Sequence, residues 1–169
     1  GWNGPGFMNH FFSPVPEVYA RWYERYSDNW TWSAVATKGV FVLPSDPAWG
    51  VVTGTKFSTA DYKAHVNLEP EPFSSGVNIV NGQWYCFELR WTQSGIFQLW
   101  INDTLRIDRS GLGMAPGGAQ QFTVSGYYND AEGRSCTGEI PCGVPQLQYR
   151  WVDDIVVSTE RIGCGAAPP

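Results

Sequence analysis

The sequence predicts an all-β protein in which two antiparallel sheets pack face to face. Apolar and polar residues alternate along several stretches, which is the pattern of a strand with one buried side. Residues that favour turns separate these stretches, and the 169 residues include 19 glycines and 12 prolines. No stretch has the apolar spacing of an amphipathic helix. About eight or nine strands of this kind bury their apolar sides only when they pack in layers.

The clearest alternation lies in residues 83–92 and 96–110, which the short link at 93–95 makes antiparallel neighbours. One side of this pair is apolar and faces the core, with Tyr85, Phe87, Leu89, Trp91, Phe97, Leu99 and Ile101. The other side is polar and aromatic, with Trp84, Cys86, Glu88, Arg90, Gln98, Trp100 and Asn102. What this second side does is the functional question that the sequence raises.

A second long strand is expected at residues 17–26, where the two sides again differ. Its core side carries Val18, Ala20 and Trp22, and its outward side carries Tyr19, Arg21, Tyr23 and Arg25. Glu24 falls on the core side, so we expect it at the rim of the core. Further strands are expected at 38–43, 49–57, 62–68, 121–128 and 148–158. In two of these, the outward residues include Lys63, His65, Thr123, Ser125 and Tyr127.

The remaining stretches are expected to lack strands. Residues 1–16 are expected to be irregular, 69–77 and 111–118 to be loops, and 165–169 to be a frayed tail. Trp30 and Trp32 lie in an expected loop, where they either form exposed binding platforms or cap the core. The whole chain, 1–169, is expected to be one domain, because this length can bury a substantial core.

The charge of the chain excludes one class of partner. Its net charge is −5 and lysines and arginines form no run, so nucleic acid is not expected as a partner. No apolar stretch approaches the ~20 residues that span a bilayer, so no membrane-spanning segment is expected. Charged residues make up only 16% of the chain and aromatic residues 15%, which, together with the frequent glycines and prolines, indicates many short strands joined by turns.

The sequence contains 4 cysteines, which allow three pairings. Cys136 and Cys142 lie together in a loop that contains glycine and proline, and we expect them to bond to each other. Cys86 and Cys164 either form a second bridge, which would hold the C-terminal end of the chain, or remain a buried thiol and a free one. Disulfides indicate an oxidising compartment, so a secreted or extracellular protein is expected.

Several segments resemble the concanavalin A-like lectin/glucanase jelly rolls. They are VYARWYERY at 18–26, WYCFELRW at 84–91 with GIFQLWINDTLRID at 95–108, and WVDDIVVSTERIG at 151–163. Within that superfamily they are similar to domains related to polysaccharide lyases that degrade glucuronan and alginate. The resemblance spans residues 17–163 and implies a jelly-roll sandwich with one concave sheet across which a sugar chain lies. It implies groove positions at Tyr19, Arg21, Tyr23, His65, Arg90, Trp100 and Tyr127.

We interpret the chain as a carbohydrate-binding, lectin-like domain without catalysis. Aromatic rings stack on the C–H faces of sugars, and arginine pairs with carboxylates in bidentate fashion, so a polysaccharide, and in particular an acidic one, is the expected partner. With Glu88 and Gln98 from the outward side of the central pair, the expected binding residues are Tyr19, Arg21, Tyr23, His65, Glu88, Arg90, Gln98, Trp100 and Tyr127.

The first alternative is a polysaccharide lyase. β-Elimination at a uronic acid needs a cation against the carboxylate, a base for the C5 proton and an acid for the leaving oxygen. Arg21 or Arg90 would supply the cation, His65 the base, and Tyr23 or Tyr127 the acid. A lone histidine on a strand is more often structural than catalytic, and the sequence does not decide between binding and catalysis.

The sequence argues against two further classes of enzyme. A glycoside hydrolase needs two carboxylates in one cleft, and the alternating acids ExDxE that are usual for hydrolases of this superfamily are absent from the sequence. Serine hydrolase chemistry is not expected either, because no GxSxG motif occurs. A non-catalytic structural or filament component of the extracellular space remains as the second alternative, although it would leave a binding groove unexplained.

A calcium site is the only metal site that the sequence suggests. Asp153 and Asp154 lie at a position that resembles the place where many jelly rolls hold a structural Ca²⁺ ion. Calcium prefers several oxygen ligands, and the stretch at Asn3 and Gly4 would add some. The alternative is that one of the two aspartates is exposed and the other is bonded to the backbone. No other cofactor is expected.

Overall fold

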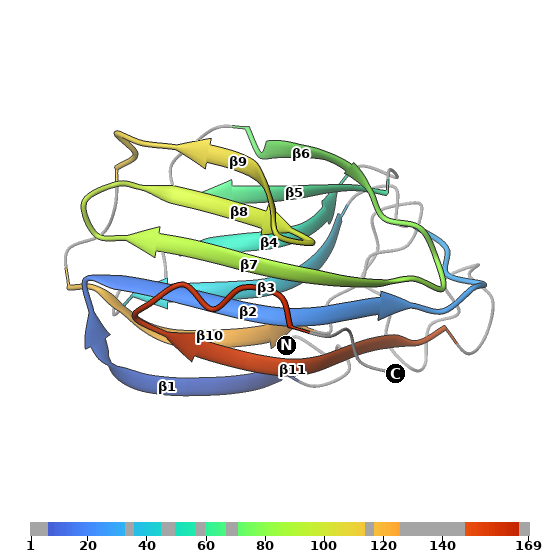
Figure 1. Cartoon of the computed structure of the whole chain (residues 1–169), viewed down its shortest axis with the longest axis horizontal. Helices are drawn as coiled ribbons and strands as arrows, with labels where there is room; N and C mark the ends of the chain where they lie inside the picture. The colour runs from blue at the N-terminus through green and yellow to red at the C-terminus, as the bar shows by residue number, and fades with distance from the viewer. Residues whose placement is uncertain are drawn as a thin grey trace.

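The computed structural model describes residues 7–32, 36–44, 50–56, 60–66, 71–113, 117–125 and 148–165. These ranges contain strands and no helix, so no described helix is long and apolar enough to cross a membrane. The strands form two antiparallel sheets, and Figure 1 shows the smaller sheet in front of the larger one. The predicted β-sandwich is therefore confirmed.

The larger sheet has six strands in the order β1-β10-β3-β4-β5-β6, and the smaller has five in the order β11-β2-β7-β8-β9. The strands of the larger sheet are β1 (Phe7–Val15), β10 (Ala119–Ser125), β3 (Ala36–Pro44), β4 (Val51–Lys56), β5 (Asp61–Val66) and β6 (Phe73–Asn78). Those of the smaller sheet are β11 (Arg150–Ser158), β2 (Glu17–Tyr26), β7 (Trp84–Thr92), β8 (Phe97–Ile101) and β9 (Thr104–Arg109).

The core lies between the two sheets and contains the residues that the alternation assigned to it. Phe87 is fully buried and stacks on Trp22 of the same sheet, with ring centroids 5.4 Å apart. It also stacks on Tyr62 of the six-stranded sheet, with ring centroids 4.2 Å apart. These aromatic contacts fix the two layers against each other in addition to the apolar area that they bury.

A charged pair is buried in the same core. Glu24, which the sequence placed at the core rim, accepts hydrogen bonds from the Arg150 guanidinium at 2.8 and 3.0 Å, from Trp22 Nε1 and from the Tyr26 hydroxyl. Arg150 also donates to the carbonyl of Ser125 in the other sheet. Burial alone would lower the pKa of Arg150, but the Glu24 carboxylate beside it raises that pKa overall. Arg150 therefore stays charged, and its bonds to Glu24 and to Ser125 link the two layers.

Three expectations about elements were wrong. Residues 7–15 form edge strand β1, although the sequence there showed no alternation. Residues 73–78 form edge strand β6, because an edge position tolerates the neighbouring prolines that suggested a loop. The stretch 96–110 is divided into β8 and β9 by a tight turn, where Asn102 and Asp103 adopt φ values of 49° and 58°. Both residue types tolerate this left-handed conformation.

Candidate functional site

The outer face of the five-stranded sheet carries the predicted binding residues that the structure describes, with the exception of His65. Tyr19, Arg90 and Gln98 lie opposite one another on β2, β7 and β8. The next row of the same face places Arg21 opposite Glu88, and Glu88 opposite Trp100. Alternation along single strands therefore predicted correctly which of these side chains leave the core.

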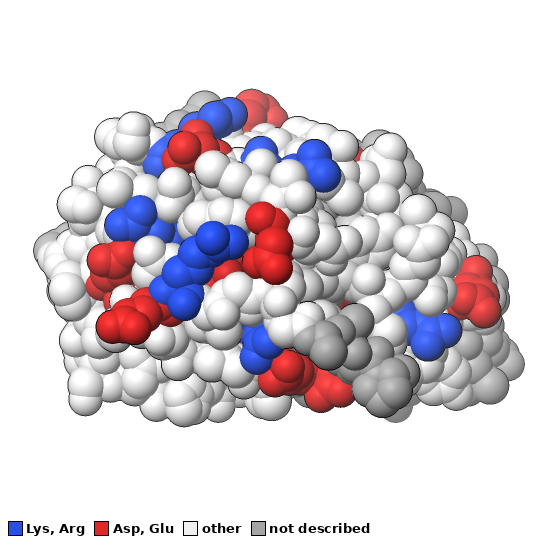
Figure 2. Space-filling view, in the orientation of Figure 1, with Lys and Arg blue, Asp and Glu red and all other residues white. Residues whose placement is uncertain are grey.

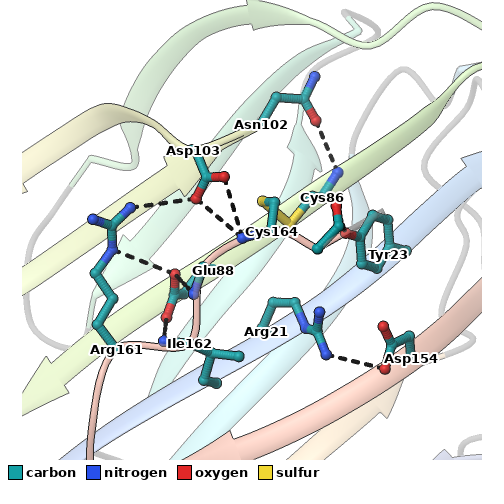
Figure 3. Close-up of a disulfide and its surroundings, with 12 residues drawn as sticks. Arg21, Tyr23, Cys86, Glu88, Asn102, Asp103, Asp154, Arg161, Ile162 and Cys164 are labelled. Atoms are coloured by element: carbon teal, nitrogen blue, oxygen red, sulfur yellow. Dashed lines mark hydrogen bonds and ion pairs between the residues drawn. A yellow bond between two sulfur atoms is a disulfide. The ribbon is translucent and has the colours of Figure 1, made fainter. Parts of the chain in front are cut away.

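This face is covered by the C-terminal segment, residues 159–165. Figure 1 shows the segment turning back from the end of β11 across β2. A disulfide joins Cys164 to Cys86 of β7, which decides the alternative that the sequence left open. The amides of Ile162 and Gly163 donate to the two carboxylate oxygens of Glu88, at 2.7 and 3.1 Å (Figure 3).

Side-chain contacts also hold the C-terminal segment against this face. Arg161 lies 3.6 Å from Glu88, 3.4 Å from Asp103 and 4.8 Å from the centre of the Trp100 ring. The Tyr23 hydroxyl donates to the carbonyl of Gly165 at 2.9 Å. As a result, Glu88 is 0% exposed, Tyr23 2%, Arg21 7% and Trp100 9%. The expectation that Arg21, Tyr23, Arg90 and Trp100 line one open groove is wrong, because the chain itself fills that position.

One end of the face remains partly open. Arg90 donates to Glu17 at 2.7 Å and to Gln98 at 3.1 Å, and its guanidinium lies over the Tyr19 ring at 5.7 Å. A shallow hollow of about 420 Å³ adjoins Arg90 and is lined by Pro16, Glu17, Thr92, Gln93 and Ser94. Figure 2 shows that charged groups of opposite sign lie side by side over this part of the sheet. The cation at Arg90 is thus neutralised by its own neighbours.

The two aspartates proposed for calcium lie at a bulge of β11. Asp154 has a φ of 46° and pairs with Arg21 at 3.0 Å, while Asp153 accepts the amide of Asp154 at 2.7 Å. Among the described residues, no group of three or more His, Cys, Asp or Glu side chains gathers as a metal site. Asn3 and Gly4 lie outside the described residues, so a calcium site here remains a prediction.

His65 lies on the opposite layer from Arg21 and Tyr23. It is on β5 of the six-stranded sheet, next to the buried Ala64 and Val66, and points away from the core. The core therefore separates it from β2, and the combination of Arg21, His65 and Tyr23 as a lyase site is wrong. Single-strand alternation gave the direction of each side chain but not the sheet to which its strand belongs.

The outer face of the six-stranded sheet carries a row of its own. Asn9, Thr123 and Phe41 lie opposite one another on β1, β10 and β3, and the row continues through β4 to His65. Asn9 Oδ1 accepts from Thr123 at 2.7 Å and from Gln121 at 3.1 Å. Phe41, Gln121 and His65 are partly exposed. The row thus combines an ordered polar group, an aromatic ring and an imidazole.

A second row on this face is basic. Lys38 and Lys63 both lie opposite position 54 of β4, and Ser74 lies opposite Lys63 on β6. Lys63 approaches Asp61 at 3.5 Å, and the same carboxylate accepts from Ser74 at 2.7 Å. Asn9, Phe41 and Gln121 were not predicted from the sequence as site residues. The outward position of Thr123 could have indicated this row. Because residues 7–15 were not predicted to be a strand, Asn9, which lies opposite Thr123, was not identified.

The remaining predictions fall elsewhere. Trp30 and Trp32 pack on Tyr26, with ring centroids 4.8 and 4.7 Å apart, so they cap the core. Tyr127, Cys136 and Cys142 lie outside the described residues.

Comparison with solved structures identifies the fold. The chain is similar to the cellulose-induced protein Cip1, with 16% identity over 94% of this chain and 75% of that one, and a TM-score of 0.64. It is also similar to the endo-β-1,4-glucuronan lyase of the fungus Trichoderma reesei, with 14% identity, coverage of 91% and 74%, and a TM-score of 0.66. The chain has the concanavalin A-like jelly-roll fold.

The alginate lyase Aly36B is a further match, with 14% identity over 94% of this chain and 75% of that one, and a TM-score of 0.61. No protein-family model matches the sequence, and no curated protein matches it. At these identities the likeness shows the jelly-roll fold, and function has to be argued from the residues.

Proposed function

We propose that this protein is a secreted carbohydrate-binding protein that holds a polysaccharide across the outer face of the six-stranded sheet. The observation that carries the proposal is the row formed by Asn9, Thr123, Phe41 and His65 on neighbouring strands of one sheet. Such a row runs across the strands, so an extended chain lying along it would meet Asn9, Phe41 and His65, while the buried Thr123 holds Asn9 in place.

The side chains along this row can stack on a sugar ring and form hydrogen bonds with its hydroxyl groups. Phe41 offers a ring for stacking, and Gln121 and Thr123 are already oriented by their bonds to Asn9, so little ordering is lost on binding. The disulfide supports a route through an oxidising compartment, and hence secretion.

The basic row favours an acidic polysaccharide. Lys38 and Lys63 lie beside His65 on the same face, and cations there would attract a uronate carboxylate. The similar structures include a glucuronan lyase and an alginate lyase in complex with an alginate trisaccharide, which is consistent with this ligand class. Oligosaccharides of glucuronate and their neutral glucose counterparts are therefore the probes to compare.

Calorimetric titration with both probes tests the proposal. We expect Phe41→Ala and His65→Ala each to weaken binding of oligoglucuronate about tenfold, as loss of one stacking or charged contact does. Arg106→Gln removes an exposed arginine of β9 in the other sheet and should leave the affinity unchanged. Unaltered affinity in both six-stranded-sheet variants would contradict the proposal. Binding of neither probe would favour a structural component.

Lyase activity is the second candidate, and one observation favours it. Lys63 and His65 point to the same side of β5, so a cation and a base lie next to each other. In β-elimination, the cation would neutralise the carboxylate while the imidazole removes the C5 proton. Growth of the ultraviolet absorbance of an unsaturated uronate, abolished in His65→Ala, would establish the enzyme. Binding without such growth supports the carbohydrate-binding protein.

A further inference from the structure

A second aromatic surface lies on the five-stranded sheet, at the end of β11 where the strand begins. Tyr149 and Trp151 are exposed by 50% and 41%, although both are large aromatic residues. Their rings are nearly parallel, with an interplanar angle of 26° and centroids 5.7 Å apart. The two rings stack on each other and form a partly apolar, exposed platform, which the packing of the core does not require.

A cation adjoins this platform. Arg25 lies opposite Trp151 on β2, and its guanidinium lies 5.4 Å from the centre of the Trp151 ring. Arg21, Arg90, Arg150 and Arg161 of the same sheet and its C-terminal segment each pair with a carboxylate. Within the described part of the chain, no carboxylate pairs with Arg25, so its charge is available to a ligand beside the aromatic pair.

Two buried donors at this place also lack acceptors. Among the described residues, neither Nε of Arg25 nor Nε1 of Trp84 has a hydrogen-bond partner, and the two residues lie opposite each other on β2 and β7. Buried donors are nearly always satisfied in folded proteins. Nε of Arg25, however, is not held by a hydrogen bond within the described part of the chain, and the contact with the Trp151 ring is what the structure shows at this guanidinium.

The residue types define the ligand class. A flat aromatic pair accepts the C–H face of a pyranose ring, and an unpaired guanidinium accepts a carboxylate in bidentate fashion. A cationic ligand is disfavoured by Arg25, and a nucleic acid by the net charge of −5. We propose that Tyr149, Trp151 and Arg25 form a second glycan site that binds a uronate sugar, with its ring on the aromatic pair and its carboxylate on the guanidinium.

This site is separate from the one under Proposed function, because the two lie on different sheets with the core between them. One polysaccharide that is long enough to pass around the sandwich would contact both sites. Two separate polysaccharide chains, one at each site, would be cross-linked by the protein. The two sites are therefore tested separately, with short oligosaccharides that reach only one of them.

Isothermal titration with a short oligoglucuronate tests the second site. We expect two molecules to bind each protein chain, and one after Trp151→Ala combined with Tyr149→Ala. Arg25→Gln should weaken the second site for oligoglucuronate about tenfold, and leave its affinity for the neutral glucose oligosaccharide of equal length unchanged. Trp151→Phe keeps a ring and should keep the stoichiometry, which separates loss of stacking from loss of folding.

The outcomes distinguish the two proposals. If Trp151→Ala, Tyr149→Ala and Arg25→Gln leave stoichiometry and both affinities unchanged, the second site is overturned. If Arg25→Gln weakens binding of the neutral oligosaccharide equally, the pairing with the uronate carboxylate is overturned. If Phe41→Ala and His65→Ala alone have no effect while the Trp151 variants do, the site on the six-stranded sheet fails and the second site stands.

Discussion

The outer faces of the two sheets carry similar kinds of residue but differ in what lies on them. On the five-stranded sheet, Glu88, Arg21 and Trp100 are buried beneath the C-terminal segment, and their charges are matched within the chain. On the six-stranded sheet, Phe41, Gln121 and His65 are partly exposed. A polar and aromatic outward pattern is thus compatible with two roles, which are contact with a ligand and contact with the chain's own returning segment.

Burial and pairing together separate these two roles. A buried carboxylate that accepts two backbone amides, as Glu88 does, contributes to the folded state and has no capacity left for a ligand. The row on the other sheet includes partly exposed side chains, and these are where the proposed ligand would bind. Substitutions on the closed face should therefore reduce stability, and those on the open face should reduce binding.

The largest effect is expected from removing the disulfide that closes the first face. Cys86 and Cys164 are 78 residues apart, and a cross-link over a loop of this size lowers the entropy of the unfolded chain. We expect Cys164→Ser combined with Cys86→Ser to lower the free energy of unfolding by about 4 kcal/mol, measured by urea denaturation. Reduction of the unmodified protein should give at least this loss, because it would also break the bridge expected between Cys136 and Cys142. An unchanged midpoint in both experiments would contradict a stabilising role of the disulfide.

A smaller loss is expected at the carboxylate beneath the segment. Glu88→Gln keeps one acceptor oxygen but removes the charge that faces Arg161 and the second acceptor for an amide. The free energy of unfolding should fall by about 2 kcal/mol, and the amides of Ile162 and Gly163 should exchange hydrogen faster. Glu17→Gln at the half-exposed pair with Arg90 is the matched control and should cost less than about 1 kcal/mol. Equal losses would show that the segment does not protect Glu88.

The stability of the protein at alkaline pH tests the burial of two tyrosines in the core between the two faces. Burial, and next the Glu24 carboxylate, raise the pKa of Tyr26 and of Tyr62 well above the ordinary value of 10.0. The folded state therefore keeps these protons above about pH 10, while the unfolded state releases them, so stability is complete below that pH and falls as pH rises. Each tyrosine should contribute a slope of about 1.4 kcal/mol per pH unit. Tyr62→Phe should reduce the slope of the free energy of unfolding against pH by that amount. An unchanged slope would show that the raised pKa of Tyr62 does not contribute to the loss of stability.

The smallest effect on stability is expected on the open face. Lys63→Gln removes a partly exposed ion pair with Asp61 and should change the free energy of unfolding by no more than about 0.5 kcal/mol. It should nevertheless weaken binding of oligoglucuronate, because Lys63 lies beside His65. Arg90→Gln on the closed face is the counterpart and should leave binding at the six-stranded sheet unchanged. Weaker binding in Arg90→Gln but not in Lys63→Gln would reverse the assignment of the two faces.

The sequence predicted the class of fold and the direction of most side chains, because both depend on a local period of two. Val18, Ala20 and Trp22 are buried, and Tyr19, Arg21 and Tyr23 point away from the core, as the alternation required. Edge strands β1 and β6 were not predicted, because the period of two is interrupted there. Phenylalanines, serines, prolines and a glycine within these strands or beside them break it.

The site was predicted less well, since it depends on contacts between distant parts of the chain. Alternation on β2 and β5 gave no information on strand order, so Arg21 and His65 were assigned to one groove although they lie on different sheets. The covering of Glu88 and Trp100 follows from the bond between Cys86 and Cys164, which was one of several pairings that the cysteines allowed.

The disulfide also determines how the protein responds to mechanical load. β11 is an edge strand, and a force applied at an edge strand normally breaks its hydrogen bonds one after another. Tension applied at Gly165 would instead pass through the adjacent Cys164 to Cys86 on β7, in the middle of the sheet. The whole sheet would then share the load, and β11 would stay in place under a pull from that direction.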